Sequence, residues 1–257
     1  MQTKLLIIMI MVISEIAWSQ ETNQIFNLEK MKYYESQLND VMELVDTNLI
    51  LSKLNSSELS YSKDSNEINA IRLGIIYHEV ALNLSFLSNT KYKGYALKSY
   101  NLLQSYVNKQ LISNELMPFA TAYSASSLSL VAAETKKLSL ISKSFKLFEI
   151  AVGKYSQFTY LPEFLRGSVA ENLPWIFWNK KKFAKTDFQS ILHKYELDQS
   201  YASAKIMSFC YWAWANQHKN KKDQAIKYLD LAIALDPNDI AARSKAEKLK
   251  QMLIKRR

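Results

Sequence analysis

A pattern of apolar residues with helical spacing repeats along this chain at intervals of about forty residues. Each copy has a small residue, a bulky residue four positions later and an apolar residue three positions after that. Their first members lie 48, 40 and 41 residues apart, and another apolar helical pattern precedes each copy. Two antiparallel helices cannot bury both of their apolar faces alone, so neighbouring pairs stack and share a core. The copies are Ala96/Tyr100/Leu103, Ser144/Phe148/Ala151, Ala184/Phe188/Ile191 and Ala225/Leu229/Ala232.

Turn-forming residues are too scarce for a chain built from strands. The sequence has only 4 Gly and 4 Pro in 257 residues, whereas about 7% Gly and 5% Pro are usual. Sandwiches, barrels and doubly wound sheets use these residues at their tight turns. A hydrophobic content of 48% also excludes a disordered chain. The sequence therefore predicts an all-α protein of stacked antiparallel helical hairpins.

The apolar periodicity places the expected helices along one helical-repeat domain over 20–257. An N-terminal helix over about 24–50 and a Ser-rich linker or mobile loop over 52–66 are expected to make up the part from 20 to 65. A basic capping helix is expected in 237–257, with one apolar face docked on the last hairpin. The four hairpins are expected within 66–236, at 66–88 with 92–111, 114–134 with 137–154, 162–177 with 181–195, and 200–218 with 222–235.

The N-terminus has the pattern of a secretory signal peptide over residues 1–19. Lys4 precedes an unbroken apolar run of nine residues, and Ala17 and Ser19 are the small residues expected before a cleavage site at Gln20. The run is too short to cross a bilayer, which takes about 20 residues, and no later stretch is long enough. We therefore expect a periplasmic or secreted protein with no transmembrane segment after cleavage. A buried N-terminal helix is the alternative interpretation.

Residues 206–239 resemble a tetratricopeptide repeat. Phe209, Trp212 and Ala213 stand at the aromatic, large apolar and small positions of that family's first helix. Asn216 stands where the family usually has Tyr, and the upstream units exceed its period of about 34 residues, so the resemblance is good only over this unit. The resemblance implies a solenoid whose concave surface is lined by the first helix of each hairpin. The second helix matches the family at Ala225, Leu229, Ala232 and Pro237.

The same resemblance implies a groove for a protein or peptide partner on the concave side. Carried over position by position, it places the first helices of the last two hairpins along this groove. A helix buried on all sides is the alternative for the aromatic run 209–215. The residues that we expect in the groove are Met207, Cys210, Trp214 and Gln217 in the last unit, and Arg166, Val169, Leu173 and Ile176 in the unit before it.

Aromatic and basic residues are concentrated in the stretch LPWIFWNKKK, residues 173–182. One interpretation is a corner between helices, where Pro174 ends one helix and the aromatic side chains fill the gap. The other is a rim at which Trp175, Trp178 and the lysines receive a ligand or an acidic partner. Arg166 would then supply a guanidinium group suited to a carboxylate.

The end of the chain is strongly basic. Residues 240–257 contain seven Lys or Arg and one acid, Glu247, and the net charge of the whole chain is +9. A solvated capping helix and a helix that attaches to an anionic envelope surface both remain open. Only 5 of the 33 basic residues are Arg, the residue most used to read bases, and we expect no nucleic-acid partner.

No motif points to catalysis, a metal or a cofactor. His78, His193 and His218 are widely separated, and the single cysteine, Cys210, excludes an intramolecular disulfide. No glycine-rich phosphate loop is present. The sequence predicts an exported, non-catalytic adaptor that binds a protein or peptide. The alternative is a periplasmic helical-repeat protein that binds a small molecule or lipid, in the manner of some transporter-associated proteins.

Overall fold

The computed structural model describes residues 26–88, 90–235 and 240–255, and within them the chain is all α-helical. This part of the chain forms eleven α-helices and one short 3-10 helix, Trp175–Phe177. The expected signal peptide and Pro237 lie outside the described residues. The helices are α2 (Leu28–Leu38), α3 (Thr47–Lys63), α4 (Glu67–Leu84), α5 (Tyr95–Asn108), α6 (Met117–Thr135), α7 (Ser139–Tyr155), α8 (Leu161–Asn172), α9 (Trp178–Leu197), α10 (Ala204–Gln217), α11 (Lys222–Leu235) and α12 (Ile240–Lys255).

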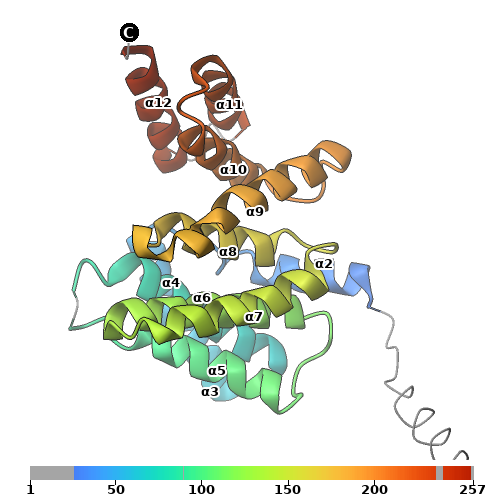
Figure 1. Cartoon of the computed structure of the whole chain (residues 1–257). Coiled ribbons are helices and arrows are strands. Elements are labelled where there is room, and N and C mark those ends of the chain that lie inside the picture. The colour runs from blue at the N-terminus through green and yellow to red at the C-terminus, as the bar shows by residue number, and fades with distance from the viewer. Residues whose placement is uncertain (1–25, 89, 236–239, 256–257) are drawn as a thin grey trace, which may run out of the picture.

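Helices that follow one another in the sequence pack against one another in space. Contacts join α3 to α4 and the two helices within each of the pairs α4–α5, α6–α7, α8–α9 and α10–α11. The first helices of successive pairs also touch, α4 with α6 and α6 with α8, and α12 packs on α10 and α11. In Figure 1, α9 crosses above the helices of the first hairpins, and α10–α12 lie beyond it. The predicted helical class and the sequential packing of hairpins are therefore confirmed.

The prediction for residues 24–66 is wrong. Two helices, α2 and α3, replace the expected long helix and linker. The Asp46 side chain accepts a hydrogen bond from Leu49 N at 2.7 Å and so begins α3 within the span assigned to the first helix. Leu54 is buried in a core cluster with residues of α4, while most of the Ser-rich stretch faces solvent. Most of the serines are thus on the exposed face of a helix, which composition alone does not distinguish from a loop.

The small residues of the repeated pattern allow the helices of each hairpin to approach closely. Ala96, Ser144, Ala184 and Ala225 are all buried where one helix of a pair meets its neighbours. Gly74 has the same function in α4, because a Cβ atom there would lie 2.4 Å from the Leu103 side chain of α5. The two helices of each hairpin therefore pack closely at small residues, four of which the sequence pattern identifies.

Candidate functional site

An apolar groove runs along the first helices of four successive hairpins, α4, α6, α8 and α10. It has a volume of about 580 Å³. Its lining includes aromatic side chains that are partly exposed, whereas aromatic side chains in folded proteins are usually mostly buried. Large apolar residues of four first helices and of the turn before α9 contribute to it: Leu82, Leu130, Val169, Phe177, Phe209 and Trp212.

The face of α10 that lines the groove differs from the face that the tetratricopeptide resemblance implies. Met207 and Cys210 are fully buried in the main core, and neither lines the groove. Lys205, Phe209 and Trp212 line it instead. Almost every position of α10 is apolar, so the pattern alone does not select the face that packs on the neighbouring helices. Burial also raises the pKa of the Cys210 thiol well above its usual value, which keeps the thiol protonated.

Trp214 and Gln217 also lie outside the groove. The Trp214 ring stacks on His218, with 4.0 Å between ring centroids, and on Tyr228 of α11, with 4.1 Å. Gln217 Nε2 donates a hydrogen bond to Glu171 Oε2 at 2.8 Å and so joins α10 to α8. Both side chains therefore connect helices in the described structure and are not presented to a ligand in the groove.

Arg166 on α8 is a buried structural residue. Its Nε and Nη2 donate hydrogen bonds to the two carboxylate oxygens of Asp187 at 2.8 and 2.6 Å, and its guanidinium carbon lies 4.3 Å from the centre of the Phe183 ring. Burial raises the pKa of Asp187 to about 6, and the bonds from Arg166 oppose that rise, so the carboxylate is ionised at neutral pH. Arg166 is thus already paired. Val169 and Leu173, from the same predicted set, do line the groove.

The corner before α9 divides into a groove-lining part and a solvent-exposed part. Pro174 and Phe177 line the groove, whereas Trp175 and Trp178 are 81% and 76% exposed and do not. Ile176 is also exposed and outside the groove. The two tryptophans predicted as site residues are therefore on the surface beside the groove, not inside it.

Part of the groove lining is polar. His78 Nε2 lies 2.8 Å from Ser126 Oγ, and His78 Nδ1 lies 3.3 Å from Glu79 Oε1. Glu79 also accepts hydrogen bonds from Asn83 Nδ2 at 3.2 Å and from Glu43 N at 3.3 Å. Because these groups bond to one another, they hold α4, α6 and the α2–α3 turn together beside the groove.

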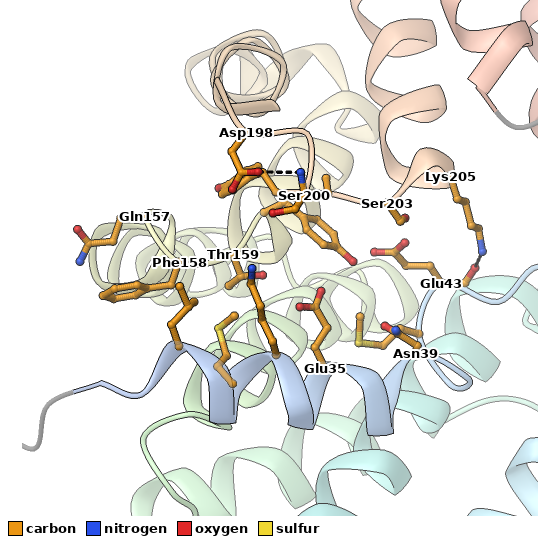
Figure 2. A pocket seen from close by; sticks show the side chains of 17 residues that line it. Glu35, Asn39, Glu43, Gln157, Phe158, Thr159, Asp198, Ser200, Ser203 and Lys205 are labelled. Atoms are coloured by element: carbon orange, nitrogen blue, oxygen red, sulfur yellow. Dashed lines mark hydrogen bonds between the residues drawn. The ribbon is translucent and has the colours of Figure 1, made fainter. Parts of the chain in front are cut away.

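A second cavity of about 520 Å³ lies between α2, the α7–α8 turn and the α9–α10 turn. Figure 2 shows the carboxylates of Glu35 and Glu43 pointing into it, with Ser203 nearby on the opposite wall. Burial raises the pKa of Glu43 to about 8; Lys205 opposes the rise, and the nearby carboxylates of Glu79 and Glu35 add to it. Lys205 Nζ donates a hydrogen bond to the Glu43 carbonyl oxygen. Glu43 and Lys205 line both cavities, so they form part of the wall between them.

No group of three or more His, Cys, Asp or Glu side chains in the described residues is placed to hold a metal ion. Among the helices that the structure describes, none is both long and apolar enough to cross a membrane.

Comparisons of this chain with protein-family models, curated proteins and solved structures give no significant match. The tetratricopeptide resemblance of 206–239 is therefore a resemblance of sequence pattern without a matching family model. The described residues establish an all-helical protein of eleven sequentially packed helices.

Proposed function

We propose that this protein is an exported, non-catalytic adaptor whose apolar groove binds a segment of a protein or peptide partner. The observation that carries the proposal is the groove itself, which crosses the first helices of all four hairpins and leaves Phe209 and Trp212 partly exposed in it. Covering these side chains would remove apolar surface from water, the main favourable term in such associations.

The dimensions of the groove suit a short extended peptide. Packed helices lie about 8–10 Å apart, so a groove that crosses four helices spans at least roughly 25–30 Å. An extended chain covers this distance with about eight residues at roughly 3.3 Å each. Polar residues also line the groove, and their side-chain oxygen atoms can accept hydrogen bonds from a peptide backbone: Asn83, Ser129, Ser168 and Asn172. A tetratricopeptide-like solenoid is the arrangement of hairpins that we propose for this groove. The contacts of α4 with α6 and of α6 with α8 support it, while α10 packs on α9 and is joined to α8 by the Gln217–Glu171 hydrogen bond.

Peptide selection with a matched pair of variants tests the proposal. We expect a displayed library of random peptides to yield apolar sequences that bind the full chain. Val169→Asp places a carboxylate in the groove and should weaken the selected peptides at least tenfold. Ile150→Asp makes the same change at an exposed position of α7 and should leave binding unchanged. Equal affinities for both variants would reject the groove as the binding site.

A small amphiphile is the second candidate, because the volume of the groove falls within the range of about 300–1,000 Å³ typical of small-molecule pockets. Its apolar lining and its polar residues, such as Asn83 and Asn172, would suit a ligand with one polar terminus. Association with a transporter would agree with this role. Native mass spectrometry of protein purified from its source should then show a retained mass that Val169→Asp abolishes. Finding only the unliganded mass would count against this candidate.

Export is a separate part of the proposal and rests on the pattern of residues 1–19. N-terminal sequencing of the protein from the envelope or medium of its source is the direct test. We expect the mature chain to begin at Gln20. A chain that still begins at Met1 would contradict the export proposal but would leave the groove proposal standing.

A further inference from the structure

We propose that a second surface, formed by the turns within the first three hairpins, docks on an anionic phospholipid bilayer. These turns are 85–94 between α4 and α5, 136–138 between α6 and α7, and 173–177 between α8 and α9. We call this surface the turn edge; it excludes residue 89, which lies outside the described residues. In Figure 1 the α4–α5 connection and the starts of α7 and α9 lie at the same side of the molecule. The proposal does not depend on what occupies the groove.

Two observations place the three turns together. Gly94 N, at the end of the first turn, donates a hydrogen bond to Glu134 Oε2, just before the second, at 3.3 Å. The groove also reaches all three turns. Its lining includes Leu82 just before the first turn, Leu138 in the second and Pro174 in the third. The edge is therefore one surface, not three separate loops.

The turn edge exposes large apolar side chains to an unusual degree. Among the residues that the structure describes, the exposed Phe and Trp side chains are Phe86, Trp175 and Trp178, and all three belong to this edge or adjoin it. Phe86 is 77% exposed. Leu87, Leu138 and Ile176 add exposed aliphatic surface on the same turns. Exposure of so many large apolar groups in one region indicates an interaction surface.

The turn edge has an excess of positive charge on its first two turns and at the start of α9, which follows the third turn. Lys91 and Lys93 belong to the first turn, Lys136 and Lys137 to the second, and Lys182 follows the third; none forms an ion pair with another described residue. No Asp or Glu occurs in 85–94, 136–138 or 173–186. The nearby Glu134 uses one carboxylate oxygen for Gly94 N, and its other oxygen is buried.

This mixture of groups matches an anionic bilayer more closely than it matches another protein. Indole rings favour the headgroup level of a membrane, where they are partly in apolar surroundings and partly in water. Lysines beside them are attracted to anionic headgroups. The apolar groups stand at the tips of the three turns that form this surface, and a soft interface can adapt to all of them at once. An acidic protein would need a rigid surface shaped to all three tips.

Binding to vesicles of two compositions tests the inference. We expect the full chain to float with vesicles that contain phosphatidylcholine and about 30% phosphatidylglycerol, much less with pure phosphatidylcholine, and less again at high salt. Tryptophan fluorescence should shift to the blue on binding. Trp175→Ser with Trp178→Ser should weaken binding at least tenfold and remove most of the shift. Lys136→Glu with Lys137→Glu should also weaken it at least tenfold, since each lysine near such a surface contributes about fivefold.

Matched variants distinguish this edge from other surfaces. Leu197→Ser with Leu231→Ser removes two exposed apolar groups elsewhere, and Lys248→Glu with Lys255→Glu reverses two exposed charges on the basic α12. Both should bind vesicles like the wild type, with unchanged thermal unfolding for every variant. Three results would overturn the proposal: no binding to anionic vesicles, equal binding by the turn-edge variants, or loss of binding only in the α12 variant. Displacement of the protein from vesicles by poly-glutamate at equal charge concentration would also overturn it and favour an acidic protein.

Discussion

Individual buried charges are held in place by specific partners in this protein. The clearest case is the Arg166–Asp187 pair, which joins α8 to α9 by two hydrogen bonds beneath the Phe183 ring. Sequence reasoning identified Arg166 as a candidate ligand for a carboxylate. The chemistry was predicted correctly, since a guanidinium does bind a carboxylate there, but the carboxylate belongs to the protein itself. The sequence cannot show this because Asp187 lies 21 residues away on the next helix.

Removing the Arg166 side chain should therefore destabilise the whole fold, instead of only weakening the binding of a ligand. Arg166→Gln leaves Asp187 buried without its cation, and we expect a loss of about 3–5 kcal/mol in the free energy of unfolding. Urea denaturation measures this loss in the free energy of unfolding. Arg243→Gln breaks an exposed ion pair with Glu247 and should cost less than about 1 kcal/mol. A similar small loss for both variants would show that the buried pair is not structural.

Glu43 should make stability depend on pH. Its pKa of about 8 in the folded protein lies above the usual value of 4.5, so the unfolded chain loses this proton at lower pH than the folded chain. Its contribution to stability is therefore present at pH 4 and is lost as pH rises towards 8. The free energy of unfolding of Glu43→Gln relative to the wild type should increase between pH 5 and 8.5. A difference that stays constant over this range would contradict the raised pKa.

At the scale of the helices, the sequence predicts what depends on local periodicity and misses what depends on neighbours. The four hairpins agree with their predicted spans to within a few residues. A helix with one buried face needs apolar residues at helical spacing, and this spacing is visible in the sequence. The break between α2 and α3 was missed: it contains neither Gly nor Pro, and Glu43 there adopts a positive φ of 53°. The groove-lining face of α10 was also missed, because tertiary contacts decide which side of an apolar helix is buried.

Helices α4 and α5 approach each other closely at Gly74. Gly74→Ala should destabilise the protein by about 1–3 kcal/mol, because the new methyl group would meet Leu103. Gly153→Ala is the matched control within α7, where a Cβ atom meets nothing within 4 Å. It should instead stabilise by up to about 1 kcal/mol through helix propensity. Thermal or urea unfolding of the two variants should give changes of opposite sign. A stabilising Gly74→Ala would mean that the two helices are farther apart than described.

At the scale of the whole molecule, the groove and the turn edge adjoin. Leu138 belongs to both surfaces, and Pro174 and Phe177 line the groove directly beside the exposed Trp175 and Trp178. Docking by the turn edge would therefore bring the mouth of the groove close to the surface of a bilayer. The composition of the chain predicts neither arrangement, because both arise from turns that are distant in sequence and adjacent only after the hairpins stack.

Photo-crosslinking of a selected peptide tests the central claim most directly. A photoreactive side chain is introduced at Val169 or Trp212 in the groove, and at Ile150 on the outer helix α7. The account predicts a crosslinked product from the two groove positions and none from position 150. Crosslinking from position 150 with none from positions 169 and 212 would show that the partner lies on the outside of the helical stack and would contradict the account.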